Sequence, residues 1–327
     1  MATFAREEMN VVMIEVRGLT KRYGRKLAIQ DVSFAIGQNE IVGLLGLNGA
    51  GKSTTMNIIS GYIGPTSGDV RIGDCDILQD SRRARALVGY LPEQPPLYGD
   101  MTVEEYLRFV ERLYRRRADR AHMDRVLEMT GLSGVRGRLI RNLSKGYRQR
   151  VGVAQAILPE PRVLVLDEPC VGLDPTQIIE MRTLIRTVSQ EMTVILSSHI
   201  LTEIQAVCSR VLVLNEGRLI ADDSPEHLAS RMHGRRRTQL RVQGEMEEIR
   251  AALANIPGVT RVECAGQREY GSWDFSVEAA GERDVRVDAF EALSAAHLPI
   301  LTAGTGEGSL ECAFIELLEG GEGRDTA

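Results

Sequence analysis

Residues 46–54 read Gly46-Leu47-Asn48-Gly49-Ala50-Gly51-Lys52-Ser53-Thr54, and this stretch decides the fold. It fits the pattern G-x-x-x-x-G-K-[ST], with an apolar run before it at 41–45 and helix-forming residues after it at 55–59. A buried strand, a glycine-rich loop and a helix start form the context in which this pattern binds phosphate. A plain glycine-rich turn is the alternative, and it does not account for these flanks. The stretch therefore predicts a nucleotide-phosphate site in an α/β fold.

The loop residues suit phosphate for separate physical reasons. The glycines permit positive φ and leave room for phosphate near the backbone. The loop amides and the helix N-terminus point partial positive charge at the ligand. Lys52 is expected to reach the β- and γ-phosphates, and the Ser53 hydroxyl to bind Mg²⁺. The candidate phosphate-binding residues are Gly46, Asn48, Gly49, Ala50, Gly51, Lys52, Ser53 and Thr54.

Composition narrows the class of protein. A chain of 327 residues predicts one large or two ordinary domains. The net charge of −5 and the pI of about 5.7 do not indicate a nucleic-acid partner. No apolar run is long enough to span a bilayer, and the N-terminus lacks the apolar core of a signal peptide. The five cysteines form no C-x-x-C pair, which favours reduced thiols in a cytosolic compartment.

Polar residues follow two further apolar runs. Residues 163–166 predict a buried strand that ends in Asp167 and Glu168, and residues 193–198 predict another that ends before His199. An α/β sheet places its catalytic groups at the carboxyl edge of its strands. A lone histidine is usually structural or exposed, but its position at a strand end favours a functional role.

Three more candidates lie in turns. Tyr23 falls between two predicted strands and could stack on an adenine ring, or be an ordinary turn tyrosine. Gln94 follows a strand that Pro95 and Pro96 bring to an end. Ser144 opens a helix, and its simplest interpretation is an N-cap alone.

The composition changes at a basic segment, residues 231–237, which is interpreted as a linker. Beyond it, residues 238–318 predict the order β-α-β-β-α-β and a final helix at 309–318. This order suggests a small α+β domain of ferredoxin-like layout. It holds no motif that can be tied to chemistry. Residues 319–327 are expected to be a frayed tail.

Taken in order, these motifs resemble the ATP-binding subunit of an ABC transporter, over about residues 11–230. The resemblance implies a P-loop ATPase domain with a mixed sheet, a helical insert at about 100–145, and binding of ATP and Mg²⁺. The nucleotide contacts would then extend to the adenine-stacking Tyr23. The residues implied for the metal are Ser53, Gln94 and Asp167. The residues implied for catalysis are Lys52, Glu168 and His199.

The family signature, usually L-S-G-G-Q, is matched by Leu143-Ser144-Lys145-Gly146-Tyr147. Lys145 and Tyr147 depart from it, whereas Ser144 and Gly146, which touch the partner's γ-phosphate in the family, are kept. Asp174 matches the dimer-crossing loop. The form L-S-K-G-Y-R-Q-R resembles exporters of the type-2 permease class, including the gliding-motility export subunit, and these often carry a C-terminal domain of this size.

The resemblance also implies partners. A second ATP-binding subunit, here a second copy, would complete a head-to-tail ATP sandwich. A polytopic membrane permease would dock near residues 94–98, which places the protein in the cytoplasm, peripheral on the inner face of the cell membrane. Leu97 and Tyr98 would form the socket, unless they merely pack on the helical insert.

Two other functions compete with that of an exporter subunit. A soluble ABC ATPase acting on ribosomes or DNA usually has two nucleotide domains or a long coiled-coil insertion, and neither is evident here. A P-loop kinase would leave the signature, Glu168 and His199 without explanation. The transported substrate, its direction and the permease are not encoded in the chain.

Overall fold

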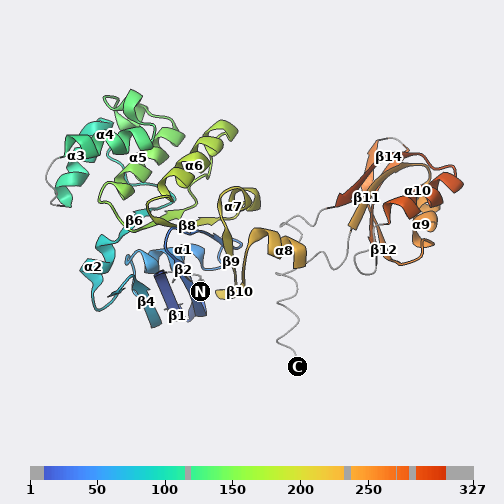
Figure 1. The fold of residues 1–327 in the computed structure, drawn as a ribbon, viewed down its shortest axis with the longest axis horizontal. Coiled ribbons are helices and arrows are strands. Elements are labelled where there is room, and N and C mark those ends of the chain that lie inside the picture. The colour runs from blue at the N-terminus through green and yellow to red at the C-terminus, as the bar shows by residue number, and fades with distance from the viewer. Residues whose placement is uncertain (1–10, 115–118, 232–236, 270, 280–284, 307–327) are drawn as a thin grey trace, which may run out of the picture. The chain divides into compact units, whose positions relative to one another are not determined.

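The computed structural model describes residues 11–114, 119–231, 237–269, 271–279 and 285–306. The chain divides into two compact units, one ending at Ser224 and one beginning at Pro225 (Figure 1). The predicted boundaries at 230 and 238 remain predictions. Most of the predicted linker, the helix at 309–318 and the tail at 319–327 lie outside the described residues.

The elements of the first unit alternate between strand and helix over much of its length. Its strands are β1 (Val12–Tyr23), β2 (Lys26–Gly37), β3 (Ile41–Leu45), β4 (Ser67–Ile72), β5 (Cys75–Asp76), β6 (Val88–Leu91), β7 (Val163–Asp167), β8 (Thr193–Ser198), β9 (Arg210–Asn215) and β10 (Arg218–Asp223). Its helices are α1 (Lys52–Ile59), α2 (Ser81–Ala86), α3 (Val103–Leu113), α4 (Arg120–Met129), α5 (Lys145–Ile157), α6 (Pro175–Val188) and α7 (Leu201–Val207), with short 3-10 turns at Ser133–Val135 and Ile140–Asn142.

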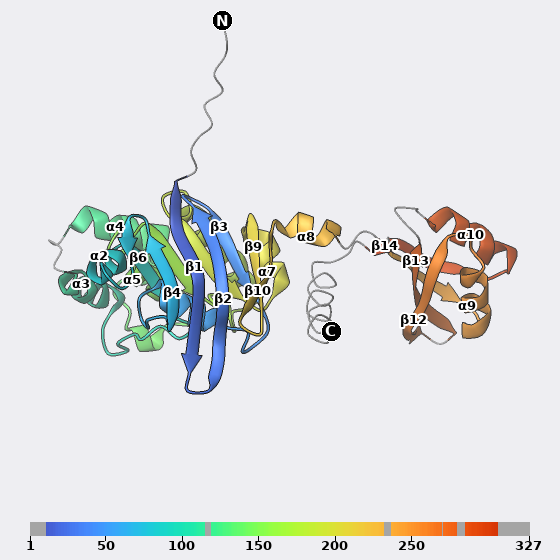
Figure 2. The same ribbon diagram turned by 90° about the horizontal axis from the view of Figure 1, so that it is seen from below.

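Two sheets of the described chain form this unit. One has the order β2-β1-β4-β5 and is antiparallel, and its long strands lie side by side in Figure 2. The other has the order β10-β9-β3-β8-β7-β6, with every pair parallel except β9 and β10. Buried side chains from α1, from both sheets and from Ile77 form one core between them. The sheets are therefore fixed to each other through α1, the helix that follows the phosphate loop.

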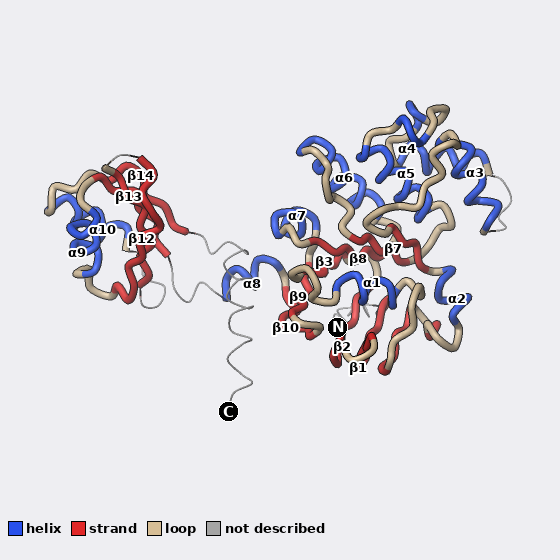
Figure 3. The backbone as a smooth tube through the Cα atoms, turned by 180° about the vertical axis from the view of Figure 1, so that it is seen from behind, coloured by secondary structure: helices blue, strands red, loops and turns tan. Residues whose placement is uncertain are grey.

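Helices α3 to α6 gather on the side of the second sheet away from the first (Figure 3). Helix α3 begins with a capping box, in which Thr102 and Glu105 each accept a backbone N–H of the other. Asp119 caps α4. Ser144 caps α5, which confirms the simplest interpretation of this residue from the sequence. In this layer α3 and α4 lie in the predicted insert, α5 is the signature helix, and α6 follows Asp174.

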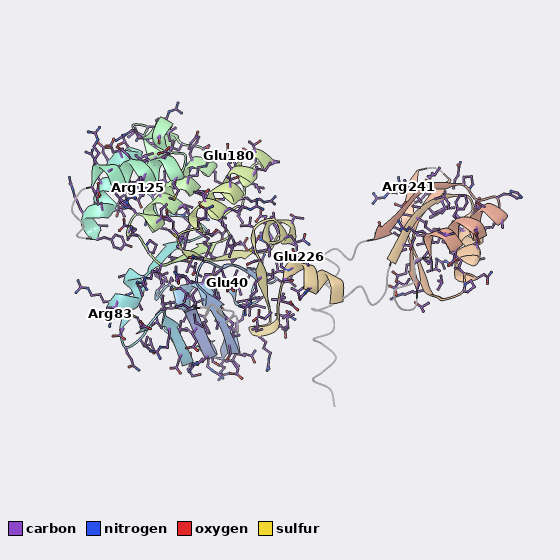
Figure 4. The ribbon with its side chains drawn as sticks, viewed as in Figure 1. Glu40, Arg83, Arg125, Glu180, Glu226 and Arg241 are labelled. Atoms are coloured by element: carbon purple, nitrogen blue, oxygen red, sulfur yellow. The ribbon has the colours of Figure 1, made fainter. Side chains whose placement is uncertain are left out.

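The second unit confirms the predicted β-α-β-β-α-β order over its described residues. Its elements are α8 (Pro225–Arg231), β11 (Arg237–Gln243), α9 (Met246–Ala254), β12 (Val259–Glu269), β13 (Ser272–Ala279), α10 (Arg286–Ala295) and β14 (Ile300–Gly306). The antiparallel sheet has the order β12-β13-β11-β14, and α9 and α10 pack on one face of it around Phe275. Across the sheet, Arg241 (labelled in Figure 4) donates to Asp274 at 2.7 Å.

The structure differs from the sequence-based expectation at several elements. β1 runs on to Tyr23, which therefore ends a strand instead of lying in a loop. Helices α2, α7 and α8 were not predicted, because each is only six or seven residues long and carries little periodic signal. No helix of the described residues is long and apolar enough to cross a membrane.

The core of the second unit gives a stability prediction. Phe275 is 1% exposed, so Phe275→Ala leaves a cavity and should lower the unfolding free energy of this unit by about 3–5 kcal/mol. Phe290→Ala is the matched control, because Phe290 is 59% exposed on α10 and should change stability by less than about 0.5 kcal/mol. Hydrogen exchange resolved by segment measures both. Equal protection of β11 to β14 in the two variants would contradict this core.

Candidate active site

The ends of three neighbouring parallel strands meet at one edge of the second sheet. In the ladder, Leu45 of β3 pairs with Ser198 of β8, and Ser197 of β8 pairs with Asp167 of β7. The phosphate loop, the two carboxylates and His199 follow directly from these ends. Segments separated by more than a hundred residues in the sequence therefore converge here, as the strand-end argument predicted.

The phosphate loop has the backbone that its glycines were expected to permit. Gly49 and Gly51 have φ of 86° and 105°, in the left-handed region. A Cβ on Gly51 would lie 2.7 Å from the carbonyl oxygen of Ala28, so the loop is also packed too tightly there for a side chain. Gly51 makes no side-chain cap at the start of α1, which leaves the first N–H groups of that helix for a ligand.

Lys52 is held inside this loop. Its side chain is 6% exposed, and Nζ donates to the carbonyl oxygens of Gly46 at 2.8 Å and Leu47 at 3.3 Å. All the candidate phosphate-binding residues, Gly46, Asn48, Gly49, Ala50, Gly51, Lys52, Ser53 and Thr54, lie on this loop and the first turn of α1. The arrangement forms a cradle of N–H groups with one buried ammonium beside it.

The two strand-end carboxylates contact the loop. Ser53 Oγ donates to Asp167 Oδ1 at 3.3 Å, and Lys52 Nζ lies 3.7 Å from Glu168 Oε1. Asp167 and Glu168 are 5% and 9% exposed, so both are shielded from water. Glu168 has φ of 49°, an unfavourable conformation for a residue with a side chain. Such strain persists only where the surroundings impose it, and it gathers at active sites.

His199 is brought onto Glu168. Its Nδ1 lies at a hydrogen-bonding distance of 2.9 Å from Glu168 Oε2, while about half of its side chain stays exposed. The contact leaves the other ring nitrogen, Nε2, to serve a ligand.

Ser197 was missed from the sequence. Its hydroxyl donates to Asp167 Oδ1 at 2.6 Å and accepts the N–H of Glu168 at 2.9 Å, and the residue is fully buried. One side chain thus holds both carboxylate residues in place. The only signal in the sequence was a polar pair at the end of an apolar run. A polar pair in the sequence does not show which residues of the neighbouring strand lie beside it.

Two further predicted site residues, Tyr23 and Gln94, belong neither to the phosphate loop nor to the ends of β7 and β8. Tyr23 is 50% exposed, with the Lys21 ammonium 5.2 Å from its ring centroid. Gln94 is exposed on the loop after β6. It lines a pocket of about 410 Å³ together with Leu97, Lys145 and other residues of this loop and of α5.

The signature and Asp174 form a second site on the helical layer. Ser144 accepts the N–H of Tyr147, and Asp174 caps α6 by accepting the N–H of Gln177 at 2.9 Å. Together with Gly146 they line a pocket of about 550 Å³, whose other residues belong to α5 and α6, among them Glu180 (Figure 4). A Cβ on Gly146 would lie 2.7 Å from the end of the Gln177 side chain, so glycine lets α5 and Gln177 approach closely here.

The fold and the first site define a P-loop protein built to bind and hydrolyse a nucleoside triphosphate. The family described as ABC transporter matches residues 29–171. The linearmycin resistance ATP-binding protein LnrL of Bacillus subtilis is 30% identical over 93% of this chain and 98% of its own length. The chain therefore belongs to the ATP-binding proteins of ABC transporters.

Solved structures agree with this assignment. A structure described as the ATP-binding subunit of an ABC transporter has a TM-score of 0.61 and 31% identity, over 67% of this chain and 93% of the other. The dimeric structure of MJ0796, a bacterial ABC transporter cassette, has a TM-score of 0.59 and 25% identity, over 65% and 98%. The protein is a transporter ATPase subunit that binds and hydrolyses ATP, and the soluble factor for ribosomes or DNA is not supported.

The Ser197 contacts predict a measurable effect. Ser197→Ala removes the donor to Asp167 and the acceptor of the Glu168 N–H. Stability should fall by about 1–3 kcal/mol, because a buried N–H loses its partner. Turnover of Mg-ATP should fall about tenfold or more, because both carboxylates lose their positioning. Steady-state hydrolysis and chemical denaturation measure the two effects.

Ser189→Ala is the control for this prediction. Ser189 is 9% exposed at the end of α6, and its hydroxyl donates to the carbonyl of Arg186 at 2.9 Å, away from the carboxylates. Its turnover should stay within about twofold of the unmodified protein. Wild-type turnover in Ser197→Ala would show that this hydroxyl does not position the site.

Proposed function

We propose that ATP is hydrolysed where the phosphate loop meets the ends of β7 and β8, with Lys52, Glu168 and His199 as the catalytic residues. One observation carries this proposal. Lys52 Nζ lies 3.7 Å from Glu168 Oε1, and Glu168 Oε2 lies 2.9 Å from His199 Nδ1. A cation, a carboxylate and an imidazole are thus linked across three elements. Phosphoryl transfer depends mainly on such positioning and on charge stabilisation.

Each residue has a role that fits its surroundings. Lys52 stabilises the negative charge of the β- and γ-phosphates from inside the loop. Glu168, fixed by its strained backbone and by Ser197, orients and polarises the attacking water. His199 donates from Nε2 to the γ-phosphate while Nδ1 faces Glu168. Tyr23, half exposed at the end of β1, stacks on the adenine ring.

Mg²⁺ fits the oxygen groups beside the loop. The Ser53 hydroxyl and the Asp167 carboxylate are 3.3 Å apart, and both are the hard ligands that Mg²⁺ takes while keeping waters and phosphate oxygens. We assign the metal to these two residues, with Gln94 as the third predicted contact. When bound, Mg²⁺ neutralises charge on the β- and γ-phosphates.

A second copy of the chain completes the site. Ser144, Gly146 and Asp174 line a pocket of the helical layer whose walls come from α5, α6 and the turns before them. The phosphate loop lies instead between β3 and α1, and none of its residues lines this pocket. A head-to-tail pair would present Ser144 and Gly146 to the nucleotide of the partner, and the relative MJ0796 is described as dimeric. Two bound ATP molecules then close the dimer, and hydrolysis releases it.

The closing dimer drives a membrane permease that docks at residues 94–98. Tyr98 contacts the rings of Tyr106 and Phe109 of α3 edge-on, with centroids 5.9 and 5.6 Å away, yet it remains 55% exposed. It therefore packs on the helical insert and also presents an apolar face. This face adjoins the 410 Å³ pocket of Gln94 and Leu97. We propose that the protein is the motor of a type-2 exporter, in the cytoplasm and held at the inner face of the membrane by its permease.

Replacing the proposed water-polarising carboxylate tests the catalytic assignment. Glu168→Gln should lower turnover about 10²-fold or more, because the general base is lost. ATP binding should persist, because the phosphate loop is unchanged. An ATP-bound dimer should accumulate, because closure precedes hydrolysis. Size-exclusion chromatography with Mg-ATP measures it, and a variant that hydrolyses at the wild-type rate would refute the assignment.

Placing charges on the proposed socket tests the permease partner. Leu97→Asp with Tyr98→Asp should leave basal hydrolysis in place but abolish co-purification with a polytopic membrane protein, because the contact would bury charge. Val287→Asp with Phe290→Asp is the control, since both are exposed apolar residues of α10. Pull-down from solubilised membranes measures association, and circular dichroism checks folding. Normal association of the first variant would exclude this socket.

A further inference from the structure

Glu203 on α7 is near enough to Glu168 and His199 for the charges of both to act on it. It is 5% exposed, and its Oε2 accepts the Ser198 hydroxyl at 2.9 Å. The same hydroxyl oxygen accepts the N–H of Ile200 at 3.0 Å. Ser198 and Ile200 are the two chain neighbours of His199. One buried carboxylate is therefore connected to the backbone on both sides of the histidine.

The buried surroundings of Glu203 are unfavourable for a charged carboxylate, so packing alone does not explain its presence there. Its Oε1 and the Nε of Arg182 on α6 are both buried. The Nε has no hydrogen-bond partner among the described residues, and the carboxylate has, besides Ser198, the weakly donating Cys170 thiol. Burial raises the pKa of Glu203, against the lowering effects of the Ser198 hydrogen bond and the Arg182 charge. Burial also raises the pKa of the nearby Cys170 thiol to about 12, and the Glu203 charge adds to this. Native structures hold such incompletely paired groups where another requirement keeps them.

A purely structural explanation is that Ser198 and Glu203 only start α7. The Ser198 hydroxyl does bind the first free N–H before that helix. However, a serine can do this alone, without a buried carboxylate. The carboxylate is also close enough to Glu168 and His199 for their charges to act on it. Its connection to the residues on both sides of His199 therefore favours a role in the site as well as at the helix start.

We propose that Glu203 is a positioning residue for ATP hydrolysis. Through the Ser198 hydroxyl it holds the turn on both sides of His199, and so sets the direction of the imidazole toward Glu168 and the γ-phosphate. This inference rests on the proposed role of His199. It assigns no contact between Glu203 and the nucleotide.

The first test compares turnover with binding. Glu203→Ala should lower kcat about tenfold or more with little change in KM, because a misdirected imidazole affects the reaction more than binding. Ser198→Ala should do the same. Glu203→Gln should stay within about threefold of the unmodified protein, because its amide oxygen still accepts the Ser198 hydroxyl. Glu111→Ala removes an equally buried carboxylate, 5% exposed on α3, and should leave kcat unchanged.

The decisive test is coupling to His199. If Glu203 acts through His199, the double variant Glu203→Ala with His199→Ala should hydrolyse ATP as fast as His199→Ala alone. The two substitutions then remove the same contribution to the rate. Proton–carbon correlation spectra of histidine-labelled, full-length protein give a second readout. The chain has five histidines, and the His199 ring signal is identified by its loss in His199→Ala. It should shift in Glu203→Ala but stay in place in Glu203→Gln and Glu111→Ala.

The outcomes separate this inference from the function on which it rests. An unshifted His199 signal, wild-type kcat in Glu203→Ala, or an equal loss of rate with and without His199 would overturn the role of Glu203 alone. Wild-type kcat in His199→Ala would overturn the catalytic assignment of His199, and this inference with it. Loss of kcat in Glu203→Gln equal to that in Glu203→Ala would show that the hydrogen bond to Ser198 is not the means of action.

Discussion

The structure depends on the parallel ladder of β3, β8 and β7. The described residues of these strands are almost wholly buried, so apolar packing on both faces keeps their register. A slip of one residue would turn every side chain to the opposite face and separate Ser197 from Asp167. Packing in the core of the sheet therefore fixes the positions of the active-site residues. Helix α1 packs in the same core and holds the antiparallel sheet against this one.

At the carboxyl ends of these strands, three charged side chains of the active site are buried. Lys52, Asp167 and Glu168 are each less than one-tenth exposed, and each contacts another charged or polar group of the site. In such surroundings electrostatic interactions are stronger than in water, and an unpaired group would be costly. The strained backbone of Glu168 belongs to the same arrangement. Some stability is given up so that a carboxylate faces a phosphate site with its orientation already set.

The helical layer uses helix caps for two purposes. Ser144 and Asp174 both satisfy N–H groups at a helix start, and both face the same pocket. The capping interpretation from the sequence was right, and it does not compete with a role in the dimer. A cap holds the side-chain oxygen and the following turn in one place. That rigidity is what a surface needs if it is to meet a nucleotide carried by another copy of the chain.

The sequence by itself determined the elements whose information is local. The glycine pattern at residues 46–54, the cap at Ser144, and the strand-ending Asp167, Glu168 and His199 follow from neighbouring residues alone. Only the tertiary structure decided that Ser197 joins the two carboxylates, that Glu203 reaches back to Ser198, and that Tyr23 ends a strand. The physical reason is that strand order and register are set by packing between distant segments, whereas periodicity and capping are set within one turn or one strand.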